Sequence, residues 1–248
     1  MYGVMAAVGC VFAIIYLKVT ERHFPALEAD GELALIYGVI GAFVGAKLLF
    51  LLTCLPECIS EIEYLFSDTE LFLQKYLYGG FVFYGGLYGS LFAAWLYCLF
   101  SKTAYDPILK LLLPLLPLIH AFGRLGCFCM GCCYGKTTAA FFGVIFHSSE
   151  IAPNGIPLIP VQLIEAAVEF GLFTILAVIS RHQCSGKRML SIYLLSYGAV
   201  RFLLEFLRGD SYRGFVGPLS FSQIISCVSI LCGIILLKFE HKKKRIDI

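Results

Sequence analysis

Charged residues are scarce in this chain: only 15% of its 248 residues are Asp, Glu, Lys or Arg. A soluble domain carries about a quarter charged residues, so this chain has too few to cover a water-facing surface. The formal net charge is only +2, and we expect no nucleic-acid partner. Hydrophobic residues make up 59% of the chain, which indicates a protein whose solvent is lipid.

Apolar runs close to the ~20 residues needed to cross a bilayer recur along the chain. They predict seven spans, at 3–18, 33–55, 77–100, 105–124, 158–180, 188–207 and 217–237. Pro114 and Pro117 should break the fourth span, and irregular helices at membrane depth are tolerated only inside protein or beside a wet cavity. We therefore predict an all-α, polytopic transmembrane bundle of about seven helices with a central cavity. Residues 1–248 are expected to form a single transmembrane domain.

Basic loops predict the orientation of the chain in the membrane. The tail carries four basic residues at Lys242–Arg245, and the 18–32 and 181–188 loops carry others. The 56–75 loop instead carries five acidic residues. We expect the N-terminus and the long 125–157 loop outside, and the C-terminus in the cytoplasm.

A polar stripe follows the sixth predicted span, where Tyr197, Arg201, Glu205 and Arg208 recur about once per helical turn. Charged residues inside a span are costly and indicate function. In one interpretation the stripe is an ion-pair ladder that joins two helices. In the other, Arg201 binds an anion and Glu205 orients it, because a guanidinium group can donate two hydrogen bonds to a phosphate. Arg124, at the end of the fourth span, would be a second arm.

Other polar residues fall near the same depth. His120 lies one helical turn before Arg124, and Glu165 and Glu169 share one face of the fifth span. Two arginines around one buried point predict an anionic ligand, which in a membrane indicates a phospholipid head group.

Short motifs occur in one order along nearly the whole chain. They are Gly41–Lys47, Tyr78–Leu87, His120–Gly126 with Gly131–Gly135, Pro160–Glu165, Tyr197–Arg208 and Ser222–Gln223. Together they resemble the prolipoprotein diacylglyceryl transferase family, and this chain looks like a divergent member with Gly-Cys-Cys-Tyr-Gly in its signature loop.

The resemblance implies an enzyme that transfers the diacylglyceryl group of phosphatidylglycerol to a thiol. The acceptor would be the lipobox cysteine in the signal peptide of a prolipoprotein, and a thioether forms as glycerol phosphate leaves. The implied place is the bacterial cytoplasmic (inner) membrane, among membrane lipids, with no cofactor and no metal. The implied catalytic residues are Arg124, Arg201, His120, Tyr84 and Tyr197. Substrate binding is implied for Gly123, Gly126, Cys127, Cys132, Gly135, Gln162, Glu165, Glu205 and Arg208.

The chain departs from the family pattern at the expected base. Tyr84 stands where the family has a histidine, and a free tyrosine with a pKa near ~10 is a poor base at neutral pH. His120 is the alternative base and is preferred to Tyr84, although it could also be a helix-packing residue. Two thiols, Cys127 and Cys132, replace an amide and a carboxylate of the family loop.

Four cysteines cluster at Cys127, Cys129, Cys132 and Cys133. We favour thiols packed around a lipid head group. Cys129 and Cys132 have the spacing of half a zinc site, and an oxidising outer compartment would permit a disulfide, so both alternatives stay open. Two other functions also remain: a phospholipid-dependent transferase with a different acceptor, and a small-solute transporter.

Overall fold

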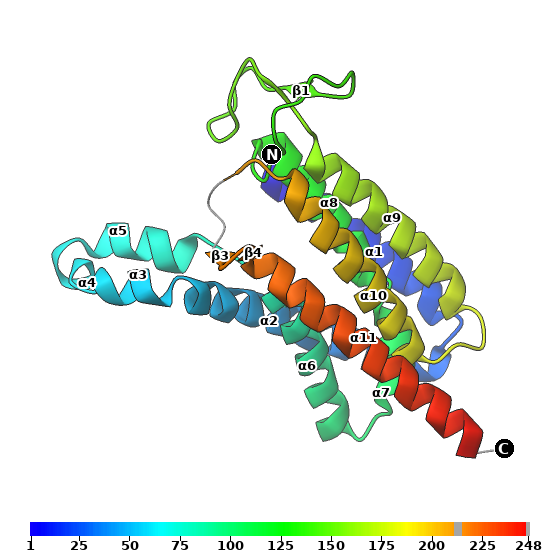
Figure 1. The fold of residues 1–248 in the computed structure, drawn as a ribbon. Coiled ribbons are helices and arrows are strands. Elements are labelled where there is room, and N and C mark those ends of the chain that lie inside the picture. Colours follow the sequence, from blue (N-terminus) through cyan, green and yellow to red (C-terminus); the bar gives the residue numbers. More distant parts are fainter. Residues whose placement is uncertain (211–214, 247–248) are drawn as a thin grey trace. The chain divides into compact units, whose positions relative to one another are not determined.

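The structure is a computed structural model that describes residues 1–210 and 215–246 (Figure 1). Its long helices are α1 (Tyr2–Glu21), α2 (Glu28–Thr53), α6 (Phe83–Ser101), α7 (Tyr105–Leu112), α8 (Leu115–Met130), α9 (Val161–Ser180), α10 (Gly186–Leu204) and α11 (Phe221–Ile246). Short helical segments are η1 (Pro25–Leu27), α3 (Leu55–Ser60), α4 (Tyr64–Ser67), α5 (Thr69–Leu73), η2 (Gln74–Tyr78) and η3 (Glu205–Leu207). The all-α prediction is confirmed.

Seven helices among the described residues are long and apolar enough to cross a membrane. They span Tyr2–Glu21, Pro25–Thr53, Phe83–Ser101, Tyr105–Met130, Val161–Ser180, Gly186–Leu207 and Phe221–Glu240. The chain is a multi-pass membrane protein, as its apolar runs predicted. The third span begins at Phe83 instead of residue 77, because Gly80 takes a φ of 68° that ends the preceding helical segment. The side chains of Lys242–Arg245, on which the orientation partly rests, lie outside the described part.

The fourth span is interrupted in its middle as predicted, but it ends later than predicted. Pro114 separates α7 from α8, as expected of a residue that cannot donate a helical hydrogen bond. The helix then continues to Met130 instead of ending at Arg124, and it accommodates Pro117 in its first turn and two glycines, Gly123 and Gly126, farther along. Gly131 takes a left-handed φ of 73° and caps the helix. Cys127 therefore lies on a helix and not in a loop, which corrects the predicted start of the 125–157 loop.

The chain divides into two compact units, residues 1–26 with 106–248 and residues 27–105. In the first unit α8 packs against α1 and α9, and α10 packs against α9 and α11 (Figure 1). The predicted 125–157 loop contains β1 (Val144–Ile145), which pairs antiparallel with β2 (Pro157–Leu158). A second small hairpin joins β3 (Phe215–Val216) to β4 (Leu219–Ser220). The prediction of a single domain stays a prediction.

In the second unit α2 and α6 touch through glycines. A Cβ atom on Gly45 would collide with the carbonyl oxygen of Gly85, and one on Gly41 would collide with that of Gly89. Small residues let two helix backbones approach within van der Waals contact, which drives helix association in lipid. This unit therefore joins its two long helices through their backbones.

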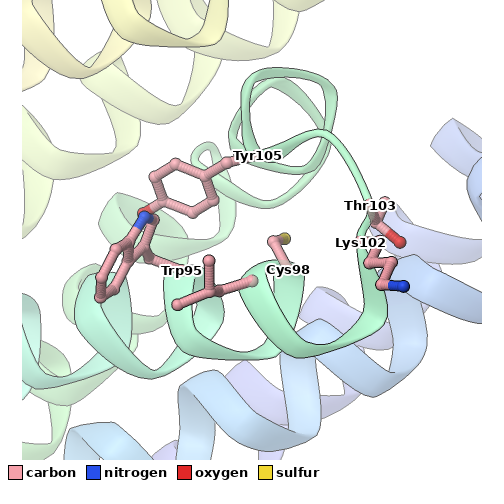
Figure 2. A pocket seen from close by; sticks show the side chains of 6 residues that line it. Trp95, Cys98, Lys102, Thr103 and Tyr105 are labelled. Carbon is pink, nitrogen blue, oxygen red and sulfur yellow. The ribbon is translucent and has the colours of Figure 1, made fainter.

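A pocket of about 260 Å³ opens at one end of α6 (Figure 2). Its lining consists of Trp95, Cys98, Leu99, Lys102, Thr103 and Tyr105. None of the predicted site residues belongs to this lining, so the pocket is not the predicted central cavity. That cavity stays a prediction.

Candidate active site

Glu165 on α9 is the centre of a buried polar cluster in the first unit. Its Oε1 atom lies 2.9 Å from Nη2 of Arg124 and 3.9 Å from Nε of Arg201. The hydroxyl of Tyr197 donates a hydrogen bond to the same oxygen at 3.3 Å. Arg124 and Arg201, which come from α8 and α10, thus approach one carboxylate from two helices.

Helical periodicity explains this convergence. His120 and Arg124 lie four residues apart on α8, and Tyr197 and Arg201 lie four apart on α10. Such pairs share one face of a helix. Because α9 packs against both α8 and α10, both faces meet the face of α9 that carries Glu165.

His120 lies between two carboxylates of α9. Its Nδ1 atom is 2.9 Å from Oε1 of Glu169, and its Nε2 atom is 3.9 Å from Oε1 of Glu165. The ring of Tyr197 meets the imidazole edge to face, with 5.3 Å between ring centroids. His120 is only 8% exposed, so it is held on three sides within the cluster. This geometry suits a proton carrier and also a histidine that fixes Glu165 in place.

The stripe on the sixth span continues past the end of α10. Nη2 of Arg201 is 2.8 Å from Oε2 of Glu205, and Nη1 of Arg208 is 3.8 Å from the same oxygen. Arg208 also donates from Nε to Oδ1 of Asp210 at 3.0 Å. Residues 205–207 form the 3₁₀ segment η3 in place of the predicted helical turn, and both Glu205 and Arg208 remain buried. Most charges of the stripe are therefore paired, as the ladder interpretation requires.

Two guanidinium nitrogen atoms take no part in these ion pairs. Nε of Arg124 and Nη1 of Arg201 are buried, and neither has a hydrogen-bond partner among the described residues. A buried donor without a partner costs about 1–3 kcal/mol, and more when it is charged. Both side chains are nearly enclosed, at 8% and 4% exposure. The two free donors are suited to an anion that is not part of the chain.

The signature loop packs against the end of α10. Gly135 pairs with Arg208 in an isolated bridge, and Gly209 donates from its backbone N–H to the carbonyl oxygen of Tyr134 at 3.0 Å. Nε2 of Gln162 donates to the carbonyl oxygen of Cys132 at 2.7 Å. These contacts bring the predicted residues Gly135, Gln162, Cys132 and Arg208 into one region.

The predicted glycines mainly permit close packing. A Cβ atom on Gly126 would lie 2.8 Å from the Tyr2 ring, and one on Gly135 would collide with the carbonyl oxygen of Ile159. A Cβ atom on Gly123 would have only the Tyr2 hydroxyl nearby, at 3.9 Å. Gly126 and Gly135 therefore support the site through packing, and their predicted contact with substrate stays a prediction.

The sequence model of the prolipoprotein diacylglyceryl transferase family matches residues 1–239. The chain belongs to this family. It is 37% identical to a phosphatidylglycerol–prolipoprotein diacylglyceryl transferase of Clostridium tetani, over 98% of this chain and 94% of that protein. A second enzyme of that name from Clostridium perfringens is 36% identical over 98% and 92% of the two chains. One from Xanthomonas euvesicatoria is 31% identical over 97% and 87%.

The cysteine cluster of this family member is arranged differently from the sequence expectation. The sulfur atoms of Cys127, Cys132 and Cys133 all lie within 4.8 Å of one another, whereas Cys129 is exposed. The thiol of Cys132 donates to the carbonyl oxygen of Cys127 at 3.6 Å. The neighbouring thiols of Cys127 and Cys132 and the nearby charge of Arg124 lower the pKa of Cys133 below its ordinary value despite its burial. Cys129, whose spacing from Cys132 left a zinc unit open as an alternative, does not belong to this group. All eleven cysteines are free thiols in this structure.

Asp210 and Tyr84 are the two remaining polar residues to be placed. Asp210 was not predicted, although a carboxylate two residues after Arg208 is a signal for a local ion pair. Tyr84 is buried on α6 in the second unit, with its ring centroid 6.4 Å from that of Tyr88. Its expected role as a base stays a prediction.

Proposed function

We propose that this protein transfers the diacylglyceryl group of phosphatidylglycerol to the lipobox cysteine of prolipoproteins. The printed names of its relatives state the lipid and the protein acceptor of those enzymes. The observation in this chain that carries the proposal is the pair of free, buried donors on Arg124 and Arg201. Both belong to guanidinium groups that approach Oε1 of Glu165, and we infer that one anion accepts from both.

The reaction needs positive charge at the phosphate. As the thiol sulfur forms its bond to the glycerol carbon, the bond from that carbon to the phosphate oxygen breaks, and negative charge grows on the leaving glycerol phosphate. Fixed donors in a site that excludes water stabilise such charge without reorganisation. Glu165 and Glu205 hold the two guanidinium groups in place, at 2.9 Å from Arg124 and 2.8 Å from Arg201.

The reaction also needs a thiolate, because the thiolate is the nucleophile. We assign proton transfer to His120 in preference to Tyr84, since His120 lies 3.9 Å from Glu165 and within the cluster. The rate should be measured against pH for His120→Gln and Tyr84→Phe. We expect His120→Gln to lower the transfer rate and to change its dependence on pH. A full rate with an unchanged pH dependence would make His120 a packing residue.

The location follows from the same proposal. We infer that the seven spans cross the cytoplasmic membrane with the N-terminus outside, since the basic 181–188 loop and tail then lie in the cytoplasm. Enzyme reporters fused after residue 155 and after residue 184 test this. A reporter enzyme that works only outside the cytoplasm should be active after residue 155 and inactive after residue 184. A reporter that works only in the cytoplasm should show the reverse. The opposite result for both reporters would invert the assigned orientation.

The decisive experiment is transfer from phosphatidylglycerol to a lipobox peptide by purified protein in detergent. Arg124→Ala should lower the rate about a hundred- to a thousandfold, the usual effect of losing a donor that stabilises charge. Arg181→Ala is the matched control, because Arg181 is an exposed arginine at the end of α9. A wild-type rate in Arg124→Ala would contradict the role of the free donors.

A peptide with serine in place of the lipobox cysteine tests the acceptor. We expect no transfer to it. If the protein consumes phosphatidylglycerol but leaves the cysteine peptide unmodified, it uses a different acceptor.

A further inference from the structure

Three sulfur atoms lie close together beside Arg124, and the proposed transfer gives them no role. Cys127 occupies the last turn of α8, and Cys132 and Cys133 follow directly after it. The chain turns at Gly131, with φ of 73°, and bends at Cys133, with φ of 59°. A non-glycine residue rarely takes a positive φ. The two turns bring all three sulfur atoms within 4.8 Å of one another.

We propose that Cys127, Cys132 and Cys133 bind one zinc ion, and that its open fourth position takes an external thiol. Zinc bonds to thiolate sulfur at about 2.3 Å, so three thiolates around one ion lie about 3.8 Å apart. The three sulfur atoms lie within 4.8 Å of one another, so their separations exceed this spacing by at most about 1 Å. Three cysteine ligands alone leave a tetrahedral zinc ion incomplete, as in sites where zinc keeps a position for a substrate.

Charge favours zinc over three bare thiolates. Three thiolates at these separations would place three negative charges together, whereas one Zn²⁺ reduces the total to a single negative charge. Arg124 and Arg208 both interact electrostatically with Cys133, so this remaining charge lies beside two guanidinium groups. The same positive surroundings would favour a further thiolate as the fourth ligand.

Access and outer contacts also fit an open site. All three cysteines are partly exposed, so the cluster is not sealed by protein. Gln162 donates to the carbonyl oxygen of Cys132, and its own Oε1 atom is buried without a partner among the described residues. A zinc site normally depends on such outer hydrogen bonds to orient its ligands. The free oxygen can accept a hydrogen bond from a group that enters beside the cluster.

This inference rests on the proposed function, because it names the acceptor thiol as the fourth ligand. The incoming thiol would lose its proton to water or to His120 when its sulfur binds zinc. That sulfur would then use a lone pair to form the bond to the glycerol carbon, and the phosphate would leave with the electron pair of the broken carbon–oxygen bond. No oxidant or reductant takes part.

Metal content is the first test, and it does not depend on activity. The whole protein is purified with reductant in detergent, loaded with Zn²⁺ and passed through a desalting column, and zinc is measured per chain. We expect about one zinc per chain in the wild type and at most about a tenth of that amount in Cys132→Ser and in Cys133→Ser. Cys129→Ser is the matched control from the same segment and should retain zinc. Equal zinc in all four proteins, or loss only in Cys129→Ser, would overturn the proposal.

Cobalt reports the ligands directly, since Co²⁺ bound by thiolates in a tetrahedral site absorbs strongly in the red and the near ultraviolet. We expect these bands in the wild type, and a further change on adding a lipobox peptide but not its serine counterpart. The absence of thiolate absorption bands would contradict metal binding by these cysteines. Bands that the cysteine peptide leaves unchanged overturn the role of the fourth position.

Alkylation of the cysteine thiols distinguishes bound zinc from a disulfide, and a transfer assay with and without zinc distinguishes this inference from the proposed function. In zinc-loaded protein the three thiols should be protected until a chelator is added. Thiols that only a reductant releases would mean a disulfide, which excludes the zinc site. Full transfer by zinc-free protein would refute the inference while the proposed function stands. Zinc-loaded protein that binds the thiol peptide but transfers nothing would refute the function instead.

Discussion

Two helix contacts in this protein are built on opposite principles. α2 and α6 meet through Gly41, Gly45, Gly85 and Gly89, with backbone against backbone. α8, α9 and α10 meet through buried charges around Glu165. In lipid the first contact gains close van der Waals packing, while the second avoids leaving charges unpaired in an apolar medium. The glycine contact can therefore be purely structural, whereas the charged contact carries a desolvation cost that a functional role explains.

The largest effect should come from breaking the charged contact at its centre. Glu165→Ala leaves Arg124 and Arg201 without their shared carboxylate, and removing one partner of a buried pair costs about 3–5 kcal/mol. Unfolding of the purified protein by denaturing detergent measures the loss. Glu150→Ala removes an exposed carboxylate in the same unit and should change nothing. Equal stability of Glu165→Ala and the wild type would mean that the cluster contributes little to folding.

A second large effect should appear in the rate rather than in stability. Arg201→Ala should lower lipid transfer about a hundred- to a thousandfold, and Arg201→Lys should restore only part of it, because lysine keeps the charge but loses the fork. The assay is transfer to a lipobox peptide at saturating phosphatidylglycerol. Full activity of the lysine variant would show that charge alone suffices and that the free Nη1 donor is not used.

The glycine contact should respond to size alone. Gly45→Ala should destabilise the second unit by about 1–3 kcal/mol, because its methyl group would collide with the α6 backbone. Gly38→Ala, on the same helix, has its nearest neighbour at 3.7 Å and should be neutral or slightly stabilising. The fluorescence of Trp95, the chain's single tryptophan, reports this change from α6. Equal behaviour of the two variants would remove backbone contact as the explanation.

The smallest effect is expected for an exposed pair. Lys75 and Glu61 lie 2.7 Å apart in the second unit, but both side chains are solvent-accessible. Exposed ion pairs contribute little, because water screens them. Lys75→Ala should leave both unfolding and transfer unchanged, in contrast to any variant of the Glu165 cluster. A loss of transfer activity would indicate that this segment contacts a substrate.

Local patterns were enough for the membrane helices and for the family. A helix that crosses lipid satisfies its backbone hydrogen bonds within one segment. Its length and apolar character can therefore be recognised in a continuous run of residues. His120 and Arg124 could be placed on one helix face, and Tyr197 and Arg201 on another, because residues four apart in a helix share a face. The break at Pro114 was also visible, because proline acts on its own helix.

Only the tertiary structure decided which of these faces meet. Glu165 became the centre because α9 packs between α8 and α10, and no local pattern states which helices are neighbours. Likewise, spacing left a Cys129–Cys132 unit open as an alternative, but the structure brings Cys127, Cys132 and Cys133 together, next to left-handed residues at Gly131 and Cys133. Helix formation depends on residues a few positions apart, whereas a buried cluster depends on segments brought together by packing, and that is where the sequence alone was insufficient.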